Sequence, residues 1–324
     1  MNPVPVRIAC LCLVAASVLP HVVHAQAPSF IGRWGTCGTQ DGQFNDAEGL
    51  GIDPSGNVYV ADVFNHRVQK FTSSGGYLGQ WSLINNGCVE CTNPVAIASD
   101  GAAAVYVADI GTCNCIDKYT VDGAFVSSFG SFGSGLGQFN KPHGLAVDQT
   151  GKIYVSDMLN HRIQVFDASG NFLFAFGGLG SNAGQFNEPI GVAVAGGVLY
   201  VADAGNNRIQ RFTTEGAFIS QWGVTGSGDG QLKSPSGLAL DPSGNVYVAD
   251  QMNNRLQAFT SSGSFLAQWG ASGLTDGHLY HPVGIVVDDA GNAYASDRCR
   301  VQKFGSVATA ARSSSWGRVK TMYR

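Results

Sequence analysis

Beyond residues 1–25, the sequence of 324 residues has no apolar run long enough to cross a membrane, for which a helix needs about 20 residues. It also lacks an excess of basic charge. Arg7 and the tail from Ser306 hold five of the 19 basic residues, so 14 remain in the body against 23 acidic residues. Non-specific nucleic-acid binding depends on a basic surface that displaces counterions. We therefore expect neither a transmembrane segment nor a DNA or RNA partner.

Motifs of common enzyme classes are missing as well. The sequence contains no Gly-x-Ser-x-Gly nucleophile motif and no phosphate-binding glycine loop placed before a helix. The 44 glycines instead separate short apolar segments, where glycine serves as a turn residue. The sequence therefore predicts no catalytic residues.

The N-terminus has the features of a secretory signal peptide. Arg7 precedes an apolar stretch, residues 8–19, that is too short to span a bilayer. Val23 and Ala25 place small residues where a signal peptidase cleaves. We predict a signal peptide over residues 1–25 and a secreted or extracytoplasmic protein, which in a bacterium means the periplasm or the cell surface.

The cysteine count supports the same compartment. After cleavage of the signal peptide an even number remains, which favours disulfides over free thiols in an exported protein. These six are Cys37, Cys88, Cys91, Cys113, Cys115 and Cys299.

The body of the chain is repetitive. Six short apolar runs each end in Asp, at spacings of 46 to 48 residues: Asp62, Asp109, Asp157, Asp203, Asp250 and Asp297. Each copy contains four β-type segments separated by Gly-rich turns, which is typical of an antiparallel meander. The inner segments are apolar at almost every position, so both faces of each sheet must be covered. Neighbouring blades of a β-propeller provide that cover.

The two ends of the body complete each other. The sixth copy stops after Phe304 and lacks its fourth strand, whereas a matching segment, Phe30 to Gly35, stands at the N-terminus. We therefore predict an all-β, six-bladed propeller of four-stranded antiparallel blades over residues 26–305, with the N-terminal strand closing the last blade. A basic tail follows over residues 306–324.

Three recurring motifs carry a resemblance to a known family. They are Gly-Gln-Phe (42–44, 137–139, 184–186), Pro-x-Gly (142–144, 189–191, 235–237) and Asn-x-Arg-[Ile/Val/Leu]-Gln (65–69, 160–164, 206–210, 253–257). Together they resemble the NHL repeat over roughly residues 30–305. The resemblance implies a six-bladed propeller but no single function, because that family includes binding modules, sensor ectodomains and a few enzymes.

Residues that recur in every blade point in six directions, so we interpret the repeated Asp and Arg as structural. The residue before the opening Gly of each inner strand differs between blades and is expected at the mouth of the central channel. Glu48, His143 and Ser236 are polar residues at such positions. In the NHL-like peptide-amidating lyase, zinc histidines occupy positions of this kind, but here only His143 does. We predict no cofactor, with a divalent cation held by Glu48 and His143 as the alternative.

The loops after the repeated Asp open on the same face and carry apolar side chains that the repeat does not require. They are Phe64, Met158, Leu159 and Met252. Exposed apolar patches mark interaction sites. The sequence therefore predicts a secreted binding or interaction module whose channel-mouth face takes a protein, peptide or glycan. The alternative is a metal-dependent hydrolase or lyase with a cation in the central channel.

The ring also suggests how the cysteines pair. Cys37 follows the N-terminal strand and Cys299 lies in the short loop of the last blade, so we expect a disulfide where the ring closes. The other four fall in blade two. Two cross-paired disulfides between Cys88 or Cys91 and Cys113 or Cys115 are expected there, with a structural zinc site as the alternative.

Overall fold

The computed structural model describes residues 26–83 and 92–307. The predicted signal peptide, Cys88, Cys91 and residues 308–324 of the basic tail lie outside these ranges. No helix within the described part of the chain is long and apolar enough to cross a membrane.

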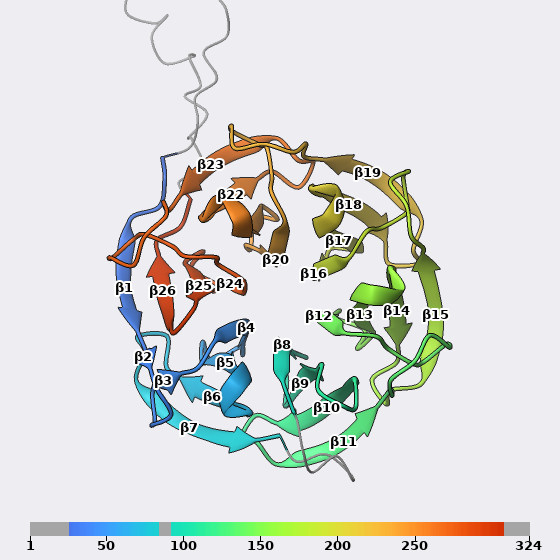
Figure 1. Cartoon of the computed structure of the whole chain (residues 1–324), viewed down its shortest axis with the longest axis horizontal. Coiled ribbons are helices and arrows are strands. Elements are labelled where there is room, and N and C mark those ends of the chain that lie inside the picture. The colour runs from blue at the N-terminus through green and yellow to red at the C-terminus, as the bar shows by residue number, and fades with distance from the viewer. Residues whose placement is uncertain (1–25, 84–91, 308–324) are drawn as a thin grey trace, which may run out of the picture.

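Six four-stranded antiparallel sheets stand around a central axis in the described residues (Figure 1). Blade one comprises β4 (Ala47–Ile52), β5 (Val58–Asp62), β6 (Arg67–Phe71) and β7 (Tyr77–Ser82). Blade two comprises β8 (Pro94–Ser99), β9 (Ala104–Asp109), β10 (Cys115–Thr120) and β11 (Phe125–Phe129). Blade three comprises β12 (Pro142–Val147), β13 (Ile153–Asp157), β14 (Arg162–Phe166) and β15 (Phe172–Gly177). Blade four comprises β16 (Pro189–Ala195), β17 (Val198–Asp203), β18 (Arg208–Thr213) and β19 (Phe218–Trp222). Blade five comprises β20 (Pro235–Leu240), β21 (Val246–Asp250), β22 (Arg255–Phe259) and β23 (Phe265–Trp269). The six-bladed prediction is confirmed.

The sixth blade joins the two ends of the chain. It consists of β24 (Ile285–Val287), β25 (Ala293–Asp297), β26 (Arg300–Phe304) and the N-terminal strand β1 (Phe30–Trp34). β1 pairs antiparallel with β26 (Figure 1). This closure gives the last blade its fourth, outer strand, as the sequence predicted.

Short elements fill the loops. β2 (Thr36–Cys37) and β3 (Gln43–Phe44) form a small parallel ladder. A 3-10 turn follows the second strand in four blades: η1 (Val63–Asn65), η2 (Met158–Asn160), η3 (Ala204–Asn206) and η4 (Gln251–Asn253).

The hydrophobic core lies between the blades. All residues of the second strands β5 and β13 are buried, as expected for sheets covered on both faces. A tyrosine of the second strand joins neighbouring blades. The Tyr59 hydroxyl donates to Asp53 Oδ2 at 2.9 Å and lies 3.2 Å from Val121 O of blade two. The core therefore fixes the angle between blades, and with it the positions of the loops.

Candidate ligand-binding site at the channel mouth

One face of the ring carries both the starts of the inner strands and the 3-10 turns. Ala47, at the start of β4, pairs with Asp62, at the end of β5. The Phe64 backbone N–H of η1 donates to Asn45 O at 3.0 Å. The loops between blades end at the same edge. We call the surface made by these strand starts, turns and interblade loops the channel-mouth face.

A buried network supports this face in blades one, three, four and five. In blade one, Arg67 Nε and Gln69 Nε2 donate to Asp62 Oδ2 at 2.7 and 3.0 Å. The Asn45 backbone N–H donates to the other carboxylate oxygen at 2.6 Å. Equivalent ion pairs are Asp157–Arg162, Asp203–Arg208 and Asp250–Arg255. The interpretation of the repeated Asp and Arg as structural residues agrees with this geometry.

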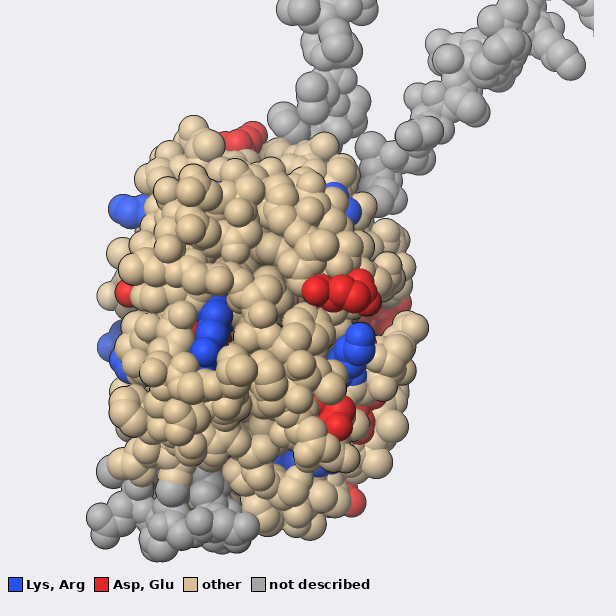
Figure 2. Space-filling model, turned by 90° about the vertical axis from the view of Figure 1, so that its right-hand side faces the viewer, with Lys and Arg blue, Asp and Glu red and all other residues tan. Residues whose placement is uncertain are grey.

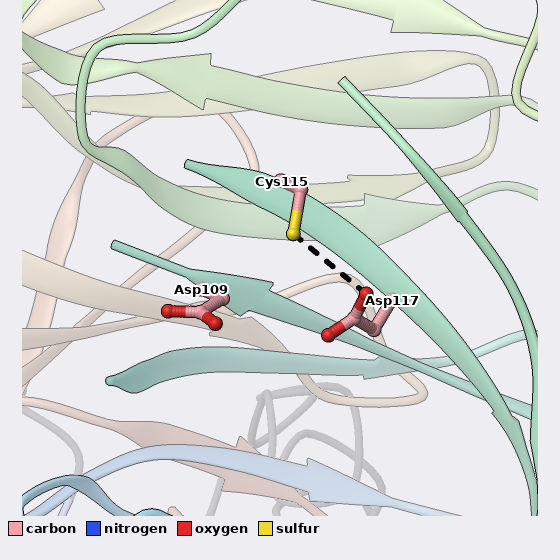
Figure 3. Close-up of side chains that lie close together, drawn as sticks. All are labelled: Asp109, Cys115 and Asp117. Carbon is pink, nitrogen blue, oxygen red and sulfur yellow. Dashed lines mark hydrogen bonds between the residues drawn. The ribbon is translucent and has the colours of Figure 1, made fainter. Parts of the chain in front are cut away.

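Blade two has a different group in place of that network. Cys115 stands where the other blades have Arg, and Asp117 stands where they have Gln; both lie on β10 beside Asp109 of β9 (Figure 3). The Cys115 thiol donates to Asp117 Oδ1 at 3.7 Å. The ligand atoms of the three buried side chains lie within 4.8 Å of one another. Their donor set, two carboxylates and a thiol, is one that fits a metal ion.

The structure corrects the predicted disulfides of blade two. Cys113 is disulfide-bonded, which excludes a zinc site that uses all four cysteines. Cys115 is a buried thiol, so the prediction that it forms a disulfide is wrong. Its side chain points toward Asp117 inside the blade instead of toward the loop (Figure 3). Burial, followed by the charge of Asp117, raises the pKa of this thiol well above its usual range.

The central channel narrows to a cavity of about 60 Å³ lined by the inner strands of all six blades. Glycines let these strands approach closely. A Cβ placed on Gly144 would lie 2.0 Å from Ile190 O of the next blade. The side chains that line the cavity are apolar, apart from that of His143. His143 is therefore the polar side chain of this cavity lining.

Glu48 and His143, the two residues of the predicted cation alternative, lie close together beside this channel. Glu48 Oε2 and His143 Nε2 lie 3.8 Å apart, and the two side chains are 19% and 17% exposed. This separation is too long for a hydrogen bond, and Glu48 Oε2 is a buried atom with no hydrogen-bond partner among the described residues. The pair therefore places two polar side chains without a mutual hydrogen bond beside the channel.

Burial keeps both members of the pair neutral. Burial, and then the charge of Asp46, raise the pKa of Glu48 to about 8. Burial also lowers the pKa of His143, because an imidazolium loses its hydration there. At neutral pH the pair consists of a carboxylic acid and a neutral imidazole. It can donate and accept protons in hydrogen bonds without carrying net charge.

The other predicted site residues differ in exposure. Phe64 and Met252 are 56% and 44% exposed, whereas Met158 and Leu159 of η2 are half-buried. Ser236 is only 1% exposed, and its hydroxyl lies 3.1 Å from both Pro282 O and Val283 O. A short side chain at this position bonds to the neighbouring backbone instead of reaching the channel. Its predicted role in ligand binding is therefore withdrawn.

Comparison with known families agrees with the ring and its network. The family model of the NHL repeat matches residues 44–71, 139–166, 186–212 and 232–259. Each match covers three strands of a blade that has the complete Asp-Arg-Gln network. The chain is an NHL-repeat six-bladed β-propeller. A comparison with curated protein sequences gave no significant match.

Solved structures with this fold include enzymes and binding proteins. A streptogramin B lyase aligns with a TM-score of 0.60 at 15% identity, over 86% of this chain and 98% of the lyase. A gluconolactonase from Xanthomonas campestris aligns with 0.60 at 15%, over 87% and 99%. An auxiliary nutrient binding protein from Bacteroides thetaiotaomicron aligns with 0.61 at 12%, over 87% and 76%. At these identities the likeness concerns the fold alone.

The NHL propeller exposes further apolar side chains that sequence reasoning missed. They lie in the interblade loops: Phe132, Leu136, Leu179, Val224, Leu274 and Tyr280. In the sequence these loops resemble glycine-rich connections. The signal that could have revealed an exposed apolar side chain is a single apolar residue between Gly and Ser. The channel-mouth face is accordingly more apolar than predicted.

The raised pKa of Glu48 predicts a pH-dependent stability. Between pH 4.5 and 8 the folded state holds a proton on Glu48 that the unfolded state releases, so stability falls as pH rises through this window. The variant Glu48→Gln cannot lose this proton. Relative to the wild type, we expect it to gain about 2 kcal/mol or more between pH 5 and pH 8 in urea unfolding. The control is Glu188→Gln, an exposed carboxyl on the same face. Parallel pH profiles for Glu48→Gln and the wild type would contradict this assignment.

Proposed function

We propose that this propeller is a secreted binding module that takes a protein, peptide or glycan ligand on its channel-mouth face. The disulfide between Cys37 and Cys299 supports an extracytoplasmic location, because such bonds persist in oxidising compartments. Figure 2 shows the side of the ring that carries β15, where basic and acidic side chains are scattered and no continuous basic patch forms. The proposal includes no nucleic-acid partner, because the body of the chain has 14 basic against 23 acidic residues.

The distribution of exposed apolar side chains carries the proposal. Of the sixteen large hydrophobic residues that are exposed in the described chain, eight lie on the channel-mouth face. The other eight lie on outer strands, as Leu78 and Ile219 do. The hairpin turns of the opposite face contribute none of the sixteen. They are short polar turns, such as residues 53–57 and 241–245, in which an Asp side chain bonds the turn backbone.

The energetics favour this face as well. Burying one large apolar side chain contributes about 1.5 to 3 kcal/mol. A partner that covers two or three of these loops gains affinity without a strong charge pair. His143, which lines the channel beside Glu48, adds a polar group that orients the ligand.

Replacing Phe64 and Met252 together by Ser is expected to weaken ligand binding about tenfold or more and to leave the fold intact, because both side chains face solvent. Peptides selected from a displayed random library on the immobilised wild-type protein provide the ligands. Their dissociation constants are then measured for both proteins.

The matched control is Leu78→Ser with Ile219→Ser, two exposed residues of the outer strands. The control variant is expected to bind like the wild type. If the peptides lose affinity only for the outer-strand variant, the binding surface lies on the outer strands and not on the channel-mouth face. Unfolding of the Phe64 and Met252 variant would show that these side chains belong to the core.

A second candidate function is a hydrolase or lyase that uses a cation at the central channel. The proximity of Glu48 and His143 favours it, since Glu and His side chains are common metal ligands and a bound cation favours the deprotonated form of Glu48. A catalytic zinc site commonly uses three protein ligands, and this pair supplies two. We propose testing it by adding Zn²⁺, Mn²⁺ or Ca²⁺ and comparing melting temperatures of the wild type and Glu48→Gln. A shift shared by both proteins would count against a cation at Glu48.

A further inference from the structure

Blade six lacks the 3-10 turn that four other blades have after the second strand. In blade one, five sequence positions separate Asp62 from its partner Arg67. In blade six only three separate Asp297 from Arg300, and the two residues face each other across a tight hairpin. The shorter loop also omits the Asn that ends each 3-10 turn.

That Asn has a defined role in the complete blades. In blade four, the Asn206 carboxamide donates to both Asp203 carboxylate oxygens, at 3.0 and 2.9 Å, and to Gly180 O at 2.9 Å. Asn65, Asn160 and Asn253 make the corresponding bonds in blades one, three and five. Four blades therefore place a primary carboxamide against the buried aspartate.

Two buried polar atoms of blade six have no hydrogen-bond partner among the described residues: Asp297 Oδ1 and Arg300 Nε. In the complete blades the Asn and the Arg Nε both donate to the aspartate, as Arg208 Nε does to Asp203 Oδ2 at 2.7 Å, whereas the shorter hairpin of blade six has no such Asn and does not form the Nε bond. Asp297 and Arg300 are 0% and 7% exposed. The two residues contact each other through a different pair of atoms: Arg300 Nη2 donates to Asp297 Oδ2 at 2.9 Å. An unsatisfied buried polar group costs about 1 to 3 kcal/mol, so a ligand that satisfies both atoms gains that energy.

Both residues line a cavity of about 360 Å³ at the seam between β1 and β26. Arg33, Trp34, Leu274 and the closing disulfide form its other walls. Arg33 and Leu274 are exposed, so the cavity opens to solvent. It exceeds the size of a single carboxamide, which means that the group arrives on a larger ligand whose apolar part contacts Trp34 and Leu274.

We propose that this seam cavity binds the primary carboxamide of an asparagine or glutamine. The amide N–H₂ donates to Asp297 Oδ1 and the amide oxygen accepts from Arg300 Nε. A carboxylate has no hydrogen to donate to Asp297 Oδ1, and its negative charge would be repelled by the charge of Asp297. An ammonium group would leave Arg300 Nε without an acceptor and would face three arginines of the lining, Arg33, Arg298 and Arg300. The site lies outside the central channel, at the outer edge of the channel-mouth face, where it shares Leu274 with that face. Its argument does not rest on the function proposed above.

The test uses two sources of the same chemistry. Free L-asparagine represents a small metabolite, and the capped peptide acetyl-Ala-Asn-Ala-N-methylamide represents a protein segment. The Asp analogue of that peptide is the matched control ligand. Binding is followed by NMR titration of the intact propeller. We expect the Asn peptide or free asparagine to perturb signals of residues 297–300, and the Asp peptide to bind about tenfold more weakly.

Leu274→Trp is expected to fill the cavity and abolish the perturbation. The matched variant is Ser181→Trp, at the equivalent loop position of blade four, where Asn206 already donates to the buried aspartate. It should bind like the wild type. Binding of asparagine alone identifies a metabolite site, and binding of the peptide identifies a site for a protein segment. The proposal is overturned if neither ligand perturbs the seam, if the Asp peptide binds equally well, or if Leu274→Trp retains binding.

Discussion

Replacing Cys37 and Cys299 together by serine is expected to lower the free energy of unfolding by about 5 kcal/mol, because their disulfide closes a loop of 262 residues and loop-closure entropy grows with the logarithm of loop length. The bond lies beside the β1–β26 seam, where the first strand of the chain completes the last blade. Its loss frees the chain ends in the unfolded state. For a protein of this size the midpoint temperature should fall by roughly 10 °C or more.

Urea unfolding followed by tryptophan fluorescence measures this loss, because Trp34 lies on β1 at the seam. Cys115→Ser is the matched control: it removes a buried cysteine of blade two without opening the ring. The control should lose much less stability than the double variant. A loss below about 1 kcal/mol in the double variant would mean that strand pairing alone holds the ring closed.

The closure of the ring was predictable because it depends on repetition. The segment from Phe30 to Trp34 has the pattern of the outer strand Phe265–Trp269, and the last repeat lacks that strand. A four-stranded blade must be completed, so the sequence determines which segment completes it. The position of Cys37 and Cys299 at one seam followed, and the disulfide with a Cα–Cα distance of 4.9 Å confirms it.

Side-chain direction at the channel was less predictable. Glu48, His143 and Ser236 occupy equivalent positions, and each inner strand has an irregular register there. Alternation of side chains between two faces does not hold at such a bulge. The longer Glu and His side chains reach one another, while the Ser hydroxyl bonds to backbone carbonyls of blade six. Side-chain length therefore decides whether a residue at this position reaches the channel or bonds to the backbone. The repeat pattern gives the position of the residue and not the reach of its side chain.

The substitution in blade two misled the sequence reasoning for a related reason. Cys115 and Cys113 are close in sequence and both belong to a cysteine-rich blade, so pairing was expected for both. In the structure Cys115 occupies the buried site that Arg fills elsewhere, and the adjacent Asp117 holds its thiol. The repeat alignment already placed Cys115 at the Arg position. Giving that alignment more weight than the cysteine count would have predicted a buried thiol.

The Asp-Arg-Gln network is the second feature with a large expected effect, and Arg208→Met in blade four tests it. Asp203 is 0% exposed, and the variant removes the partner whose Nε lies 2.7 Å from its carboxylate. Removing one member of a buried ion pair costs about 3 to 5 kcal/mol. Arg208 also donates to three interblade-loop carbonyls at 2.7 to 2.9 Å, which lose their donor. We expect urea unfolding to show a loss in this range.

Two further variants separate the charge from the packing. Arg211→Met removes a half-buried arginine of the same strand, whose guanidinium lies 5.7 Å from the Tyr200 ring centroid; this should cost about 1 kcal/mol or less. Asp203→Asn combined with Arg208→Met removes the uncompensated charge, so it should recover part of the stability that Arg208→Met loses. If the double variant is no more stable than Arg208→Met, the loop carbonyls and not the buried carboxylate carry the effect. The arginine would then act mainly by tying the interblade loop, and thereby the channel-mouth face, to its blade.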